Sequence, residues 1–199
     1  MTNYSQNSEQ EVILSYFAKK GPGHLLDIGA NDGQTFSNSR ALLEHFDWSG
    51  LLVEPSPTAF KKLNTLYGNN NLVECLNVAI GTIKGKIDFY DMGDHVGRGD
   101  TSLLATTAKD EMNRWRGTQF TKTRCKCVTY AEIEDVYEFI TIDAEGVDID
   151  ILKQINLRHT QMLCIEWNNK IADLAVIRSI VPVEMKEIYR SLENVIFAR

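Results

Sequence analysis

Short and nearly continuous apolar runs recur along the chain and alternate with segments whose apolar residues follow helical spacing. Continuous apolar runs are typical of strands that are buried on both faces, as in a parallel sheet. The alternation predicts an α/β fold built on a single doubly wound sheet with helices on both faces. The strands are expected at His24–Asp27, Gly50–Glu54, Leu72–Ile80, Tyr137–Asp143 and Met162–Asn168, with a terminal pair at Met185–Arg190 and Asn194–Ala198.

The segments with helical spacing predict the helices that cover this sheet. Near the N-terminus, Ser8 and Glu11 have the spacing of a capping box, and an apolar stripe follows until Gly21 ends the helix. Residues 1–22 are therefore expected to form a helix that packs on the core, and residues 23–199 to complete one domain. Further helices are expected at about Gln34–Phe46, Pro57–Tyr67, Thr107–Arg116 and Ile171–Val181, and after Gly146.

A predicted hairpin arm interrupts the alternation between Gly81 and Asp100. Within it, Lys86–Tyr90 has the composition of a strand, and Met92–Asp100 is rich in glycine and mixed charges. This loop is interpreted either as a lid or as an ordinary solvated loop, since both have this composition. Farther along, Thr121–Val128 alternates polar and apolar residues and predicts a strand with one wet face.

The residues after the first strand have the composition of a nucleotide-binding loop. Gly29 and Gly33 allow the backbone to turn sharply and to approach a ligand closely. The helix expected behind them, with Phe36 facing the core, would offer unpaired N–H groups to a phosphate or carboxylate. The spacing departs from the dinucleotide fingerprint G-x-G-x-x-G, because Asn31 occupies the position of the second glycine. An NAD-dependent oxidoreductase is therefore the less favoured alternative.

A carboxylate ends each of the first two strands. Glu54 ends the second strand, where an acid can accept hydrogen bonds from both ribose hydroxyls of a nucleotide. Asp27 and Glu54 could each simply cap a loop. Together, at the ends of consecutive strands, they favour a ribose-binding role.

Three successive motifs resemble those of the FkbM-type methyltransferases: Asp27–Thr35, Val53–Pro57 and Ile142–Gly146. The resemblance extends from about Leu25 to the C-terminus, and three ordered motifs are more specific than one glycine loop. It implies S-adenosylmethionine as cofactor and a Rossmann-like methyltransferase sheet, mostly parallel with an antiparallel last strand. It also implies O-methylation of a hydroxyl on a sugar, a glycan or a small natural product. The cofactor contacts expected from the motifs and the resemblance are Asp27, Gly29, Asn31, Gly33, Glu54, Pro55, Ser56, Val78, Ala79 and Asp143, with Val78 and Ala79 beside the adenine ring.

Methyl transfer to a hydroxyl requires a group that accepts the hydroxyl proton, and three residues are candidates. Asp143 ranks first because it ends the central strand, followed by Glu145 and His95. Asp143 could instead cap the following helix or hold the methionine amino group of the cofactor through water. Glu145 could also be a cap, and His95 could be a solvated loop residue.

A metal-dependent mechanism is an alternative that the sequence leaves open without favouring it. Asp143, Glu166 and Asn168 carry oxygen ligands at two adjacent strand ends and could hold Mg²⁺. The arrangement is similar to that of catechol-type O-methyltransferases, but Trp167 separates the acid from the amide. Strict alternation along the strand would place Glu166 and Asn168 on the same face.

Composition narrows the classes of partner. The net charge of −6 argues against a protein that grips nucleic acid through phosphates. The N-terminus lacks the pattern of a secretory signal, and no run approaches a membrane span, so a cytoplasmic protein without a membrane partner is expected. The four cysteines lack zinc-type pairs and are expected to be reduced, buried thiols.

The expected partner is therefore a small-molecule or glycan acceptor. The 199-residue chain leaves little room for a dedicated substrate domain, so a homo-oligomer that encloses a larger acceptor stays open. The alternative of another class is a protein that binds the cofactor without transferring methyl and serves as an assembly partner.

Overall fold

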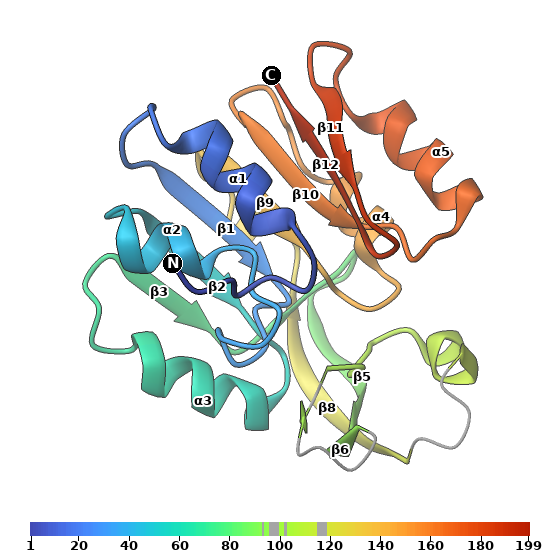
Figure 1. Ribbon diagram of the computed structural model, residues 1–199. Helices are drawn as coiled ribbons and strands as arrows, with labels where there is room; N and C mark the ends of the chain where they lie inside the picture. Colours follow the sequence, from blue (N-terminus) through green and yellow to red (C-terminus); the bar gives the residue numbers. More distant parts are fainter. Residues whose placement is uncertain (93, 96–99, 102, 115–118) are drawn as a thin grey trace.

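The computed structural model describes the chain except residues 93, 96–99, 102 and 115–118, and of residues 94, 95, 100 and 101 it describes only the backbone (Figure 1). Its centre is a seven-stranded sheet in the order β11-β12-β10-β9-β1-β2-β3. The five neighbouring strands β10, β9, β1, β2 and β3 run parallel to one another, and β12 runs antiparallel to both β10 and β11. The predicted doubly wound sheet with an antiparallel last strand is confirmed. The strands are β1 (His24–Ile28), β2 (Ser49–Val53), β3 (Val73–Leu76), β9 (Phe139–Ile142), β10 (Met162–Glu166), β11 (Lys186–Arg190) and β12 (Asn194–Ala198).

Helices cover both faces of this sheet, because successive strand residues point to opposite sides. Leu25 contributes to an apolar cluster with residues of α1 (Glu9–Phe17), α2 (Arg40–His45) and α3 (Pro57–Tyr67). Leu26 contributes to a second cluster, with residues of α4 (Asp148–Leu152) and α5 (Ile171–Ile180), and Figure 1 shows the two groups of helices on either side. None of the described helices has the length and apolar character needed to cross a membrane.

The N-terminal helix packs on the core through Ile13 and Phe17, and its start differs from the prediction. Phe17 packs edge-on against Trp48, with ring centroids 4.7 Å apart. Ser8, expected to cap the helix in a capping box, makes no side-chain cap hydrogen bond. Glu9 is buried instead and accepts hydrogen bonds from the Asn7 backbone N–H and the Ser191 hydroxyl, at 2.8 and 2.9 Å. The carboxylate thus ties the start of α1 to the loop before β12.

The helix predicted at Gln34–Phe46 is wrong over its first half, because α2 begins only at Arg40. Asp32 accepts hydrogen bonds from the backbone N–H groups of Gln34 and Thr35, at 2.8 and 2.7 Å. Such local side-chain bonds compete with helical ones and favour a turn. Phe36, expected on the buried side, has a positive φ of 54° and is 50% exposed. No helix N-terminus therefore lies directly behind the glycine loop.

A second sheet of three strands stands beside the main one, in the order β4-β8-β5. It comprises β4 (Ala79–Ile80), β5 (Gly85–Met92) and β8 (Phe120–Val128). The strand predicted at Leu72–Ile80 is therefore split, since β3 joins the main sheet and β4 the small one. The Asn77 amide marks the break and donates to the backbone oxygens of Glu54 and Pro55, at 2.8 and 3.2 Å.

The remaining elements are short. The short strands β6 (Asp94–His95) and β7 (Asp100–Thr101) pair antiparallel. The loop predicted at Met92–Asp100 lies largely outside the described residues. Two 3-10 helices, η1 (Lys109–Arg114) and η2 (Tyr130–Glu132), complete the chain. An α-helix was predicted around η1. Because η1 buries none of its residues, it has no apolar face that would stabilise regular helix.

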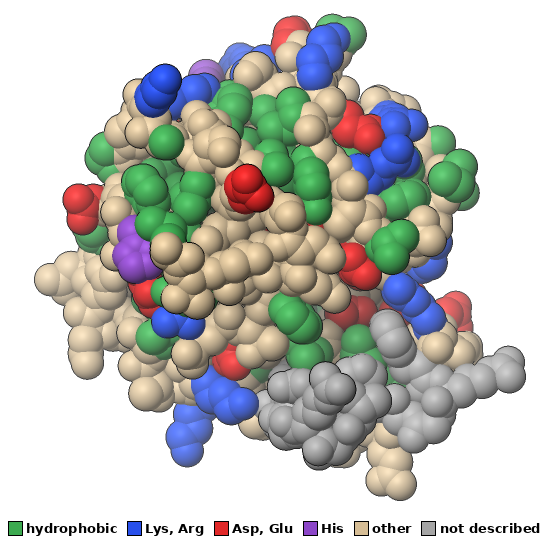
Figure 2. Space-filling view, viewed as in Figure 1, with side chains coloured by type: hydrophobic (Ala, Val, Ile, Leu, Met, Phe, Trp, Pro, Cys, Tyr) green, Lys and Arg blue, Asp and Glu red, His purple; other side chains and the backbone are tan. Residues whose placement is uncertain are grey.

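The four cysteines are free. Cys125, Cys127 and Cys164 are buried as predicted, whereas Cys75 is only partly buried. On the face of the molecule shown in Figure 2, Lys and Arg side chains occur at several separate places, and Asp and Glu side chains lie among them. The described side chains of this face therefore form no patch of a single sign.

Candidate active site

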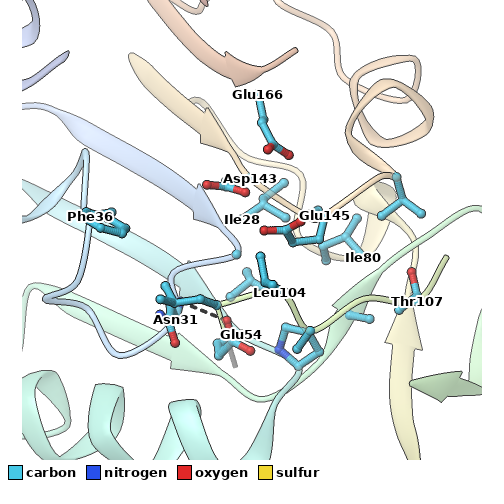
Figure 3. Close-up of a pocket in the computed structure, with 18 of the residues that line it drawn as sticks. Ile28, Asn31, Phe36, Glu54, Ile80, Leu104, Thr107, Asp143, Glu145 and Glu166 are labelled. Atoms are coloured by element: carbon cyan, nitrogen blue, oxygen red, sulfur yellow. Dashed lines mark hydrogen bonds between the residues drawn. The ribbon is translucent and has the colours of Figure 1, made fainter. Parts of the chain in front are cut away.

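A cavity of about 280 Å³ lies where the parallel strands end, between the main sheet and the small sheet (Figure 3). Ligands of doubly wound folds bind at this edge of the sheet. Ten of the predicted site residues line the cavity: Gly29, Asn31, Glu54, Pro55, Val78, Ala79, Asp143, Glu145, Glu166 and Asn168.

Glu54 is a buried carboxylate held by two backbone donors. Its Oε2 accepts from the N–H of Asn31 at 2.9 Å, and its Oε1 from the N–H of Ser56 at 2.6 Å. Burial raises the pKa of Glu54 to about 8, against the lowering effect of these two donors. Each carboxylate oxygen keeps a lone pair, so Glu54 can accept two further hydrogen bonds from a ligand in the cavity.

The glycine loop places Gly29 and Asn31 in the cavity wall. Gly29 has a φ of 88°, and a Cβ there would collide with the backbone oxygen of Asp143. The glycine therefore allows β1 and β9 to end close together. Asn31 also has a positive φ, 47°, and its buried Oδ1 has no hydrogen-bond partner in the described structure. A buried oxygen without a donor beside the cavity fits a polar ligand in this loop.

Three of the predicted cofactor contacts support the wall rather than line it. Asp27 is buried in β1 and accepts from the Ser39 hydroxyl at 2.6 Å, and burial raises its pKa to about 6. Gly33, at φ 73°, packs where a Cβ would meet side chains of α3. Ser56 caps α3 by accepting from the Ala59 N–H and donates to Asp91 at 3.0 Å.

One part of the cavity wall is apolar. Val78 and Ala79, the residues expected beside adenine, lie here together with Ile80. Phe89 of β5 and Leu104 complete this wall, and both are buried. Neither residue was expected from the sequence, because no local pattern indicates that β5 and the segment containing Leu104 close over the edge of the main sheet.

The opposite wall gathers three carboxylates. One carboxylate oxygen each of Asp143, Glu145 and Glu166 lie within 4.8 Å of one another. Burial is the largest cause that raises the pKa of Glu145 and Glu166 well above the usual range, and the neighbouring carboxylates raise it further. Burial also raises the pKa of Asp143 to about 7. Because the Asp143 side chain is exposed to the cavity, solvent there reduces this shift.

The loop that carries Asp143 and Glu145 is held by Asp148, which was not expected from the sequence to have a role in the site. Its carboxylate accepts from the N–H groups of Ala144 and Gly146, at 2.7 and 3.0 Å. Glu145 adopts a positive φ of 50°, and its backbone oxygen accepts from the Thr106 hydroxyl at 2.6 Å. Asp148, rather than Asp143 or Glu145, therefore makes these loop-capping bonds, and both candidate bases keep side chains that face the cavity.

Two further predicted residues have distinct positions. Asn168 lines the cavity, but β10 ends at Glu166 and Asn168 has a φ of 54°, so the two do not share a face by strand alternation. The backbone of His95 lies in β6, and its side chain is outside the described part of the chain.

Comparisons with known proteins agree with this architecture. A model of the methyltransferase FkbM domain matches residues 27–194. Among the curated proteins, a search found no match. The solved structures similar to the chain include the following three, at identities that show a shared fold alone.

The first is an FkbM methyltransferase from Methylobacillus flagellatus KT, with a TM-score of 0.57, 13% identity and coverage of 89% of this chain. This chain spans only 44% of that protein. The second is a ribosomal protein L11 methylase from Lactobacillus delbrueckii subsp. bulgaricus (TM-score 0.52, 12% identity, 97% of this chain and 77% of that one). The third is a precorrin-6y C5,15-methyltransferase from Geobacter metallireducens GS-15 (0.50, 11%, 100% and 92%). The fold is thus that of Rossmann-like methyltransferases, and the family model assigns the chain to the FkbM methyltransferase domain family.

Proposed function

We propose that this protein is an S-adenosylmethionine-dependent O-methyltransferase that methylates a hydroxyl of a sugar, a glycan or a small natural product. The observation that carries the proposal is that one cavity joins Glu54, an apolar wall and the Asp143 carboxylate. A ribose-binding acid and a proton acceptor are thus available on opposite sides of one ligand site.

The residues of the cavity fit the parts of the cofactor. Glu54 would accept hydrogen bonds from the two ribose hydroxyls, and Val78 and Ala79 would pack against the adenine. The unpartnered Oδ1 of Asn31 would accept a hydrogen bond from a polar group of the cofactor. When bound, the cofactor supplies an electrophilic methyl group on a positively charged sulfur.

The chain's own contribution to the reaction is positioning and proton transfer. Holding the acceptor oxygen in line with the methyl group can contribute roughly 7–11 kcal/mol. As the oxygen forms its bond to the methyl carbon, the carbon–sulfur bond breaks and the hydroxyl proton moves to a base. Asp143 is the proposed base, because its carboxylate faces the cavity and the capping bonds of its loop are made by Asp148.

The cofactor is tested by the melting temperature with S-adenosylhomocysteine, with NAD as control. A ligand at 100 times its Kd adds about 2.7 kcal/mol. For a domain of this size we expect a rise of roughly 5–10 °C. A rise with NAD alone would contradict the proposal.

The acceptor atom is tested by transfer of a labelled methyl group to a panel of matched sugars and small molecules that carry either a hydroxyl or an amine. We expect label on the hydroxyl compounds. Label on the amines alone would overturn O-methylation while leaving the cofactor assignment intact.

A further inference from the structure

The three carboxylates of the cavity have more acceptor oxygens than the described protein donors satisfy. Glu166 is 8% exposed, and its Oε2 has no hydrogen-bond partner among the described residues. The buried Oε2 of Glu145 and Oδ1 of Asn168 also lack a partner there. Figure 3 shows the carboxylate of Glu166 directed toward Asp143 and Glu145. Leaving buried polar oxygens without donors is costly, so this arrangement of three acceptors points to a ligand that satisfies them, such as a cation.

The positively charged side chain that lines the cavity also pairs with an acid other than the three carboxylates. Of the described residues that line the cavity, Arg114 is the single Lys or Arg. Its Nη1 pairs with Glu111 at 2.7 Å, and the Nζ of Lys170 lies 3.7 Å from the same carboxylate. Arg114 lowers the pKa of Asp143 and Glu145, yet one guanidinium shared with Glu111 cannot neutralise three carboxylates.

The ligand atoms indicate which kind of cation fits. Carboxylate and amide oxygens select hard divalent cations, whereas zinc and copper prefer nitrogen and sulfur. Opposite ligands of Ca²⁺ are separated by about 4.6–5.2 Å, and those of Mg²⁺ by about 4.2 Å, twice the metal–oxygen distance. Of three ligands only one pair can be opposite, and adjacent oxygens of an octahedral Mg²⁺ lie about 3 Å apart. The three carboxylate oxygens, which all lie within 4.8 Å of one another, can therefore converge on one cation once their side chains move inward.

From these observations we infer that Asp143, Glu145 and Glu166, assisted by the Asn168 amide oxygen, form a binding site for a hard divalent cation of the Mg²⁺, Mn²⁺ and Ca²⁺ class. The ligands come from the ends of two adjacent strands, β9 and β10, and from a loop fixed by Thr106 and Asp148. If the proposed function holds, one carboxylate oxygen of Asp143 would bind the cation and the other would stay available to accept the proton of the acceptor hydroxyl, whose pKa the cation would lower.

Binding of Mn²⁺ alone to the full chain, followed by electron paramagnetic resonance and calorimetry, tests the site without cofactor or acceptor. We expect one site, from which Mg²⁺ or Ca²⁺ displaces Mn²⁺. Glu166→Gln keeps the shape of the side chain and removes its charge, and should weaken Mn²⁺ binding at least tenfold, as should Glu145→Gln. The control Glu184→Gln changes an exposed acid far from the ligand set and should bind as the parent does.

Metal-free melting separates loss of the site from loss of the fold. Because Glu166→Gln removes a buried charge, its melting temperature without metal should equal or exceed that of the parent. The rise that Mn²⁺ causes in the parent should disappear in the variant. Binding of Mn²⁺ with equal affinity to both, or no binding up to about 10 mM, beyond the range of weak protein sites, would overturn the inference.

One outcome identifies a different occupant. If the Glu166→Gln protein loses affinity for amine-bearing acceptors but the parent binds no Mn²⁺, the carboxylates bind a cationic acceptor and the metal inference is wrong. If S-adenosylhomocysteine still raises the melting temperature of Glu166→Gln, the cofactor part of the proposed function stands whatever the metal result. The two failures are therefore distinguishable.

Discussion

The two polar ends of the cavity contain the same chemical group in opposite surroundings. At one end, Glu54 accepts two backbone hydrogen bonds. At the other, Asp143, Glu145 and Glu166 crowd together, and two of them have a buried oxygen without a donor. A carboxylate that is fixed by donors is suited to binding, whereas a crowded group without donors is suited to accepting a proton or a cation.

The difference arises from the backbone that follows each strand. After β2, the chain turns into α3, and the Ser56 N–H of this turn donates to Glu54, as does the Asn31 N–H of the loop after β1. After β9, the corresponding N–H groups are taken by Asp148. The acids of that loop are thereby left to face the cavity.

The largest effect should come from Asp143→Asn, which keeps the shape of the side chain and removes its ability to accept a proton. General-base catalysis typically contributes about 10²–10⁴-fold, so kcat should fall by that factor. The Kd for S-adenosylhomocysteine, measured by calorimetry, should change little. Equal losses in kcat and in cofactor affinity would remove the distinction between the two ends and assign Asp143 to binding.

The packing of the two ends against each other is tested at Gly29. Gly29→Ala should destabilise the fold by about 2–5 kcal/mol, because a left-handed conformation costs roughly 1–2 kcal/mol and the added Cβ meets the Asp143 oxygen. Gly21→Ala is the matched control, since Gly21 has a similar φ of 77° with nothing within 4 Å of a Cβ. Urea denaturation of both variants isolates the collision. Equal losses would show that φ alone matters.

The fold and much of the cavity follow from local sequence. The apolar runs predicted the strands β1, β2, β9, β10 and β12, since a strand buried on both faces needs apolar residues nearly throughout. Glu54, Asp143 and Glu145 could be predicted to line a site because strand ends meet at one edge of a parallel sheet. The same argument placed Glu166 there.

The features that could not be predicted depend on contacts between residues distant in sequence, or on side-chain hydrogen bonds that compete with helix formation. The apolar character of Ala79 and Ile80 indicates that they are buried, but it does not indicate that their strand pairs with β8 instead of β2. The late start of α2 results from hydrogen bonds to Asp32 that helix periodicity does not reveal. Leu104 reaches the cavity only because the arm folds back over the sheet edge.

A smaller effect is expected from Glu54→Gln, which tests the binding end. Charge-assisted hydrogen bonds contribute about 1.5–3 kcal/mol, so the affinity for S-adenosylhomocysteine should fall by that amount at pH 9, where the carboxylate is ionised. The metal-induced rise in melting temperature should stay, because the three-carboxylate end is unchanged. Unaltered cofactor affinity would remove Glu54 from the site.

The smallest effect concerns pH, and it also separates the two ends. Burial, with the nearby carboxylates of Asp91 and Asp27, holds the pKa of Glu54 near 8, well above its ordinary value of 4.5. The stability contributed by this raised pKa is fully present below pH 4.5 and is lost as pH rises through about 8. Ribose hydroxyls, in contrast, bind best to the ionised carboxylate, so cofactor affinity should rise over the same window, by at most tenfold per pH unit.

The two opposite trends can be measured together, by melting the protein with and without S-adenosylhomocysteine between pH 6 and pH 9. The melting temperature without ligand should fall as the pH rises, while the ligand-induced increase should grow. In Glu54→Gln the growth of the ligand effect should vanish, because the titrating group is gone. If it persists in that variant, a group other than Glu54 governs the binding end, and the assignment of the ribose to Glu54 is wrong.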